Sequence, residues 1–181
     1  MKYGEIFSKP SVSEQPGIYL FTVEYINGYL IYMAGWTMRP FKKRLREHIR
    51  EYQKGTYTIF ETIDLQKGRR TEIWHGMWKK KSTNTPKIKR LFQSRQRELE
   101  PAIEKLLCTF RIFFAPLEVE RRILARIEAA IMNTLYSEIE PISTIPDKGM
   151  ALAPRWEKET PFIVHNLSPV YLYGLPQYFE A

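Results

Sequence analysis

The sequence has a single cysteine, Cys108, and no long uninterrupted apolar run. One cysteine can form neither an intrachain disulfide nor a cysteine-based zinc site. Its apolar context, Leu-Leu-Cys-Thr-Phe, predicts a buried structural thiol. No segment approaches the roughly 18 apolar residues of a membrane span, and the first ten residues lack the apolar core of a signal peptide. We therefore expect a soluble cytoplasmic protein.

Acidic residues are scarce relative to basic ones, with 20 Asp and Glu against 28 Lys and Arg and a net charge of +8. Between Lys67 and Arg97 the only acidic residue is Glu72. This asymmetry favours a polyanionic partner, nucleic acid first, although a charge run is often only a solvated face. The candidate phosphate contacts in this basic segment are Arg69, Arg70, Lys79, Lys80, Lys81, Lys87, Lys89 and Arg90.

The composition otherwise suits one folded domain over residues 1–181. A hydrophobic share of 44% and an aromatic share of 14% exclude global disorder. Chains of this length usually form a single core, and we find no internal repeat or low-complexity linker. We predict an α+β domain with a small antiparallel sheet flanked by helices.

A β-hairpin followed by a helix is the clearest local pattern. Residues 17–25 and 29–34 are rich in aromatic and β-branched side chains, and Asn27-Gly28 between them is a strong hairpin-turn signal. A helix should follow from Pro40 and end at Gly55. Its apolar stripe comprises Phe41, Leu45, Ile49 and Tyr52. Arg44 and His48 lie one turn apart along one edge of that stripe.

The remaining pattern predicts strands and helices in alternation. Residues 56–65 and 71–74 suit a second hairpin. Residues 86–99 suit a helix, which Pro101 should then break or kink. Residues 109–115 suit a strand. A second long helix should cover residues 117–136. Beyond Pro141 the chain is rich in proline and aromatics, with short strands at 162–165 and 170–173. This extension either wraps the core or forms a partner surface.

Glu128 stands at the edge of the apolar face of the helix over residues 117–136. A carboxylate is costly to desolvate there unless a cation compensates it. The cation could be a metal, or an arginine of the same helix in an ordinary ion pair; those arginines are Arg121, Arg122 and Arg126.

Two tyrosines on adjacent strands, an arginine and histidine on one helix, and a carboxylate on another suit phosphodiester hydrolysis. That reaction needs a group that accepts a proton from water, a cation beside the phosphate oxygens, and a carboxylate that can hold a divalent metal. Spacing alone does not show that the residues meet. Each tyrosine could equally be a core aromatic.

The motif residues resemble the GIY-YIG nuclease family. They are Gly17-Ile18-Tyr19, then Tyr32 and Gly35, then Lys42-Lys43-Arg44-Leu45 with His48. Arg126-Ile127-Glu128-Ala129 after the strand over residues 109–115 would supply the family's glutamate. The second motif carries one extra residue, Tyr32-Met33-Ala34-Gly35, which either moves the glycine or is absorbed as a bulge.

The resemblance implies a metal-dependent DNA endonuclease. Tyr19 and Tyr32 would help to activate water, Arg44 and His48 would contact the phosphate, and Glu128 would hold Mg²⁺ or Mn²⁺. Lys42 and Lys43 would join the nucleic-acid contacts. Residues 56–108 would be an insertion and residues 141–181 a C-terminal extension. The alternatives are an inactive nucleic-acid-binding relative and a nuclease acting on RNA or branched DNA.

Overall fold

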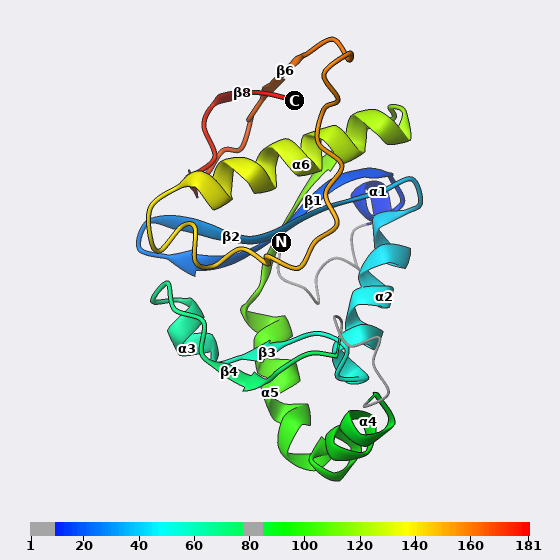
Figure 1. Cartoon of the computed structure of the whole chain (residues 1–181), viewed down its shortest axis with the longest axis vertical. Coiled ribbons are helices and arrows are strands. Elements are labelled where there is room, and N and C mark those ends of the chain that lie inside the picture. Colours follow the sequence, from blue (N-terminus) through cyan, green and yellow to red (C-terminus); the bar gives the residue numbers. More distant parts are fainter. Residues whose placement is uncertain (1–9, 78–84) are drawn as a thin grey trace.

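A four-stranded sheet is the centre of the fold in the computed structural model, which describes residues 10–77 and 85–181 (Figure 1). Its strand order is β5-β1-β2-β7. Strand β1 (Gly17–Tyr25) pairs antiparallel with β2 (Gly28–Thr37) and with β5 (Arg111–Pro116), whereas β7 (Leu172–Tyr173) runs parallel to β2. The predicted α+β class is confirmed. The prediction of a purely antiparallel sheet is wrong, because the C-terminal extension returns to the sheet and adds β7 parallel to β2.

The predicted hairpin is confirmed, but its turn lies one residue earlier than Asn27-Gly28. Tyr25 pairs with Gly28, so the two loop residues are Ile26 and Asn27. The left-handed conformation falls on Ile26, with φ of 48°. Gly28 instead belongs to β2, where the carbonyl oxygen of Tyr171 would lie 2.5 Å from a Cβ at this position. The close approach of β7 therefore requires this glycine.

The extra residue of the second motif forms a β-bulge in β2. Across the hairpin, Phe21 pairs with Met33, and the next residue, Thr22, pairs with Ile31. Tyr32 is therefore the residue without a counterpart in β1. A bulge turns two consecutive side chains to one face, and both Tyr32 and Met33 pack on the same side of the sheet.

The bulge keeps Gly35 directly opposite Tyr19. A Cβ atom on Gly35 would lie 2.4 Å from the Cζ and hydroxyl atoms of Tyr19. The tyrosine ring therefore lies across the backbone of the neighbouring strand, in space that only glycine leaves open. Of the two outcomes open at the second motif, the fold takes the bulge.

Ten further elements surround the sheet within the described ranges. On the N-terminal side of the chain these are α1 (Pro10–Ser13), α2 (Phe41–Gln53), β3 (Ile59–Phe60), α3 (Thr62–Leu65), β4 (Glu72–Trp74) and α4 (Thr85–Ser94). They are followed by α5 (Gln96–Thr109), α6 (Arg121–Ser137), β6 (Ile163–His165) and β8 (Tyr178–Glu180). Strands β3 and β4 form the second antiparallel pair that the sequence predicts, and β6 pairs with β8.

Three local predictions in this region are wrong. Residues 56–65 form only a two-residue strand before α3 begins, and the helix break lies at Arg95, between α4 and α5, while Pro101 stays inside α5. Cys108 is exposed. Helical rotation explains the exposed thiol, because α5 buries Leu99, Ile103 and Leu106 on one face and turns residue 108 away from it.

The two faces of the sheet support two separate cores. Along β1, Tyr19 and Phe21 point to one face and Ile18 and Leu20 to the other, as the two-residue period of a strand requires. Helices α2 and α5 cover the first face, and α6 covers the second (Figure 1). A sheet buried on both sides holds its side chains in fixed positions.

The segment over residues 56–108 is part of the first core. Its buried side chains are Ile59, Phe60, Leu65, Trp74, Phe92, Leu99, Ile103, Leu106 and Leu107. The C-terminal extension packs with α6 on the other side and supplies β7 to the sheet. Among the described helices, none combines the length and the apolar character needed to cross a membrane.

Replacing Gly35 by Ala tests the contact between Gly35 and Tyr19. The new methyl group must displace the Tyr19 ring, so we expect a loss of about 1 to 3 kcal/mol in the free energy of unfolding, measured by urea denaturation. The control is the same change in a Tyr19→Ala background, where the ring is absent and the added cost should largely disappear. An equal cost in both backgrounds would contradict the contact.

Candidate active site

The Tyr19 hydroxyl is the centre of a buried hydrogen-bond network that joins β1 to α2. Tyr19 is 1% exposed, and its hydroxyl lies 2.8 Å from Nε2 of His48. The Nε–H of Arg44 donates to the same hydroxyl at 3.1 Å. Arg44 and His48 meet Tyr19 together because residues four apart lie on one helix face.

Burial determines the protonation states of this network. It raises the pKa of Tyr19 to about 12, although the nearby Arg44 guanidinium acts in the opposite direction. Burial, with a smaller contribution from Arg44, lowers the pKa of His48 to about 3. At neutral pH the phenol is therefore protonated and the imidazole is neutral. In the tautomer that carries its proton on Nδ1, His48 accepts from the Tyr19 O–H at Nε2, while the Tyr19 oxygen accepts from Arg44.

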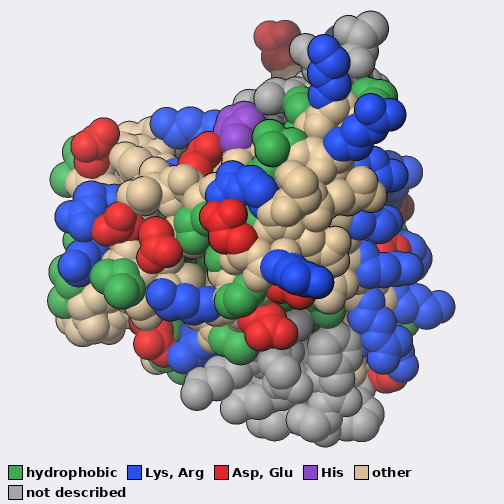
Figure 2. Space-filling model, turned by 90° about the horizontal axis from the view of Figure 1, so that it is seen from below, with side chains coloured by type: hydrophobic (Ala, Val, Ile, Leu, Met, Phe, Trp, Pro, Cys, Tyr) green, Lys and Arg blue, Asp and Glu red, His purple; other side chains and the backbone are tan. Residues whose placement is uncertain are grey.

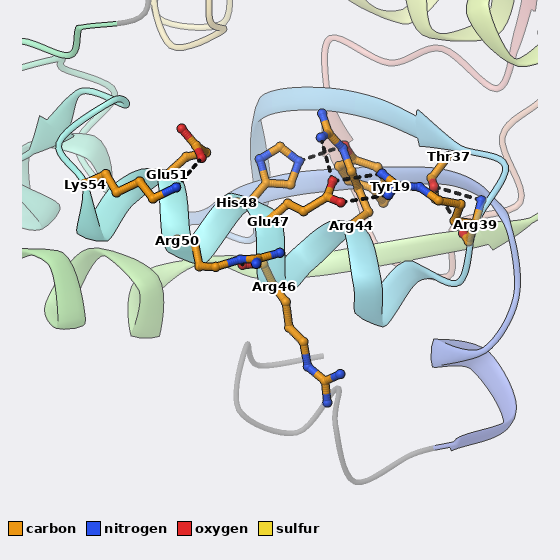
Figure 3. A network of polar contacts seen from close by, with 10 residues as sticks. All are labelled: Tyr19, Thr37, Arg39, Arg44, Arg46, Glu47, His48, Arg50, Glu51 and Lys54. Carbon is orange, nitrogen blue, oxygen red and sulfur yellow. Dashed lines mark hydrogen bonds and ion pairs between the residues drawn. The ribbon is translucent and has the colours of Figure 1, made fainter.

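Glu47 orients the Arg44 guanidinium from the solvent side (Figure 3). Its Oε2 accepts from Nη1 of Arg44 at 3.2 Å, and its two carboxylate oxygens accept from Arg39 at 2.8 and 2.9 Å. Arg39 in turn exchanges backbone hydrogen bonds with the Thr37 hydroxyl at the end of β2. In contrast, Figure 3 shows Arg46 of the same helix directed away from the network. Arg44 therefore contacts both Glu47 and Tyr19.

Tyr32 lies on the same face of the sheet but makes different contacts. It is 5% exposed and is hydrogen-bonded to Tyr52 of α2, and burial raises its pKa. Arg70, between α3 and β4, lies over its ring, with Cζ 5.8 Å from the ring centroid. The backbone carbonyl of Tyr32 accepts from the N–H of Asp147 at 2.8 Å. Tyr32 is therefore held by three distant segments of the chain.

Glu128 of α6 is 9% exposed and approaches the network from beyond the sheet. Burial raises its pKa to about 7, with a hydrogen bond from the Trp36 side chain and the charge of Arg44 opposing the shift. Within residues 10–77 and 85–181 no ion pair engages this carboxylate. The arginines of α6 have other partners: Arg121 lies over Trp36, Arg122 pairs with Glu159, and Arg126 donates to backbone carbonyls.

Arg44 and Glu128 line two hollows. The first, called here the aromatic hollow, has a volume of about 390 Å³ and is also lined by Tyr32, His48 and Arg70. The second, called here the outer hollow, is about 470 Å³ and is also lined by Tyr19, Trp36, Thr37, Met38, Arg39 and Arg121. Of the predicted catalytic set, Tyr32 and His48 therefore line the aromatic hollow, Tyr19 lines the outer hollow, and Arg44 and Glu128 line both.

The donor set of these hollows is compatible with a hydrated divalent cation and not with a closed metal cage. Among the described residues, no group of three or more His, Cys, Asp and Glu side chains could hold a metal. Mg²⁺ commonly uses only one or two carboxylates and completes its shell with water and phosphate oxygens. The buried Glu128 carboxylate, lacking an ion pair in the described part of the chain, has the chemistry of such a ligand.

The predicted nucleic-acid contacts fall into four groups. Arg70 lines the aromatic hollow, whereas Arg69 pairs with Asp64 and Lys42 pairs with Glu14. The exposed residues outside both hollows are Lys43, Lys87, Lys89 and Arg90. Lys79, Lys80 and Lys81 lie outside the described residues. Figure 2 shows Lys and Arg gathered along its right-hand edge, the side on which α2 lies in Figure 1.

Several residues at this site were not singled out from the sequence as functional. Trp36 contacts Glu128, and Asp147 belongs to the C-terminal wall of the aromatic hollow. Glu47 could be expected beside Arg44, because it stands three residues later on the helix. Asp147 carries no such signal, since no spacing rule links it to Tyr32 across more than a hundred residues.

Neither a protein family model nor a curated protein nor a solved structure matches this chain. The resemblance to GIY-YIG nucleases therefore rests on the motif residues themselves. Their positions on β1, β2, α2 and α6 provide the geometric argument that follows.

A pH-dependent stability experiment tests the burial of Glu128. A carboxyl whose pKa rises on folding stays protonated in the folded state while it ionises in the unfolded chain. Wild-type stability should therefore fall as pH rises through the interval between about 4.5 and about 7. Between about pH 5 and about pH 8, the unfolding free energy of the wild type should fall by roughly 2 to 3 kcal/mol through this group. Glu128→Gln should not show this fall.

The measurement is urea denaturation of both proteins at the two pH values. Glu118→Gln, which changes an exposed glutamate before α6, is the control for losing an acidic residue and should keep the wild-type fall. Parallel curves of unfolding free energy against pH for wild type and Glu128→Gln would contradict a Glu128 pKa raised by burial.

Proposed function

We propose that this protein is a metal-dependent endonuclease of the GIY-YIG type that hydrolyses a phosphodiester bond of DNA with an activated water. The observation that carries the proposal is that His48 and Arg44 both contact the hydroxyl of Tyr19. Glu128 lines the same hollow as Tyr19 and Arg44. A buried structural tyrosine needs one hydrogen-bond partner, whereas this hydroxyl has two, one of them a cation. A phosphate between Arg44 and Glu128 would lie beside that hydroxyl.

Arg44 binds the phosphate and offsets the negative charge that develops on its oxygens. Glu47 and Arg39 position its guanidinium, so the cation is oriented before substrate arrives. An anionic phosphate also counteracts the repulsion that Arg44 exerts on a protonated His48. The pKa of His48 then rises only in part, because burial, the larger cause of its low value, remains.

Tyr19 transfers a proton and does not act as a free phenolate. Its raised pKa makes ionisation at neutral pH unfavourable, but its hydroxyl already donates to His48. The attacking water gives a proton to the Tyr19 oxygen while the tyrosine's own proton moves to Nε2 of His48. The resulting hydroxide forms the new P–O bond, the bond to the leaving oxygen breaks, and that oxygen takes a proton from solvent. His48 then returns its proton to solvent, which restores the neutral imidazole.

Glu128 is the protein ligand for the divalent cation. Mg²⁺ or Mn²⁺ bound there supplies positive charge at the phosphate and lowers the pKa of a bound water. The exposed basic residues of α2 and α4 contribute sequence-independent phosphate contacts.

Plasmid cleavage in Mg²⁺ or Mn²⁺ tests the proposal. Arg44→Ala, Glu128→Ala and Tyr19→Phe should each lower the cleavage rate on the order of 100-fold, because each removes a separate contribution to the chemical step. Arg46→Ala removes the same charge from the same helix and should stay within about twofold of wild type. Tight binding without cleavage in either metal would contradict the enzyme and favour an inactive DNA-binding relative.

The basic residues of α4 should be visible in the salt dependence of DNA binding. Removing Lys87 and Lys89 together should make the slope of log K against log salt shallower by up to about 1.8, because each phosphate contact contributes about 0.9. Lys67→Ala with Lys158→Ala removes equal charge from exposed positions elsewhere. The measurement is fluorescence anisotropy in EDTA. Equal changes in both double variants would indicate only a net-charge effect.

A further inference from the structure

The aromatic hollow has a lining that phosphate chemistry alone does not require. Part of its lining is aromatic. The ring centroid of Tyr57 lies 5.6 Å from that of His48 and 5.0 Å from that of Tyr52. Arg70, Lys148 and Asp147 add two cations and a carboxylate to the same hollow. Flat apolar surface with a few donors and acceptors suits a planar, polar-edged heterocycle.

The hollow is also recessed below the surface. Three of its lining residues, Tyr32, Tyr52 and His48, are 5%, 3% and 2% exposed. A paired base lies inside the duplex, behind the sugar-phosphate backbone, and cannot reach these side chains while the backbone rests on Arg44. Only a base that has left its stack can enter. The volume of about 390 Å³ is in the range of small-molecule sites.

The C-terminal extension provides a fixed wall for this hollow. The Asp147 N–H donates to the Tyr32 carbonyl at 2.8 Å, and the Tyr136 hydroxyl donates to the Asp147 carbonyl at 2.5 Å. Arg70 donates to the carbonyl of Pro146 at 2.8 Å from the opposite side. These contacts connect the extension to the sheet, to α6 and to the segment before β4. The hollow is therefore formed before any ligand binds.

We propose that the aromatic hollow binds one unpaired nucleobase next to the phosphate held by Arg44. This inference rests on the proposed function for the position of that phosphate. It defines the substrate class as DNA with an extrahelical or single-stranded nucleotide beside the cut. Tyr57 provides the stacking surface, while Arg70, Lys148 and Asp147 face the polar edges of the base.

Binding to three matched oligonucleotides tests the proposal. They are a fully paired duplex, the same duplex with a one-nucleotide bulge, and that bulge without its base. Fluorescence anisotropy in EDTA measures affinity without cleavage. We expect the bulged duplex to bind about tenfold more tightly than either of the others, because stacking of one base on an aromatic ring contributes an effect of this size. The abasic bulge separates base recognition from flexibility.

Two tyrosine substitutions locate the effect. Tyr57→Ala should abolish the preference for the base, and Tyr57→Phe should retain it because the ring remains. Tyr171→Ala, at an exposed position beside β2, is the control and should behave as wild type. The wild-type comparison needs no variant, so the test stands even if Tyr57→Ala fails to fold.

Equal affinity for the bulge with and without its base overturns the proposal, and so does a preference that survives in folded Tyr57→Ala. Cleavage is scored separately in Mg²⁺. Cutting of paired DNA without base preference leaves the nuclease and removes the base site. Base preference without cutting retains the base site and removes the nuclease.

Discussion

The close contact between the Tyr19 ring and the Gly35 backbone is the constraint on which the site depends. In most pairs of facing residues on neighbouring strands, both residues carry a Cβ atom that keeps the two side chains apart. Here Gly35, opposite Tyr19, has no Cβ atom. The ring uses that space to extend across β2, so its hydroxyl reaches Arg44 and His48. The bulge at Tyr32 is what keeps Gly35 in register. The bulge and the glycine thus act together.

Burial on both sides of the sheet explains the electrostatics of the site. The first core holds the tyrosines against α2, and the second holds α6 so that Glu128 lines the same hollows as Arg44. Desolvation raises the pKa of Glu128 and of Tyr19 and lowers that of His48. All three shifts favour the neutral forms of groups that lie near the Arg44 cation.

The segments outside the motif regions complete the site. The segment over residues 56–108 contributes Tyr57 and Arg70 to the aromatic hollow, and its apolar side chains continue the first core. The C-terminal extension adds β7 to the sheet and a wall beside Tyr32. Because these segments touch the motif residues directly, they define the shape of the hollows that a substrate would meet.

Sequence periodicity alone determined the hairpin, the helix carrying Arg44 and His48, and the position of Glu128 at the edge of an apolar face. Those features follow from local rules, since side-chain direction repeats every two residues in a strand and about every 3.6 in a helix. Tertiary structure alone decided the meeting of Glu128 with Arg44, the bulge at Tyr32, and the wall at Asp147. Contacts between distant segments depend on how whole elements pack, and no local spacing records that information.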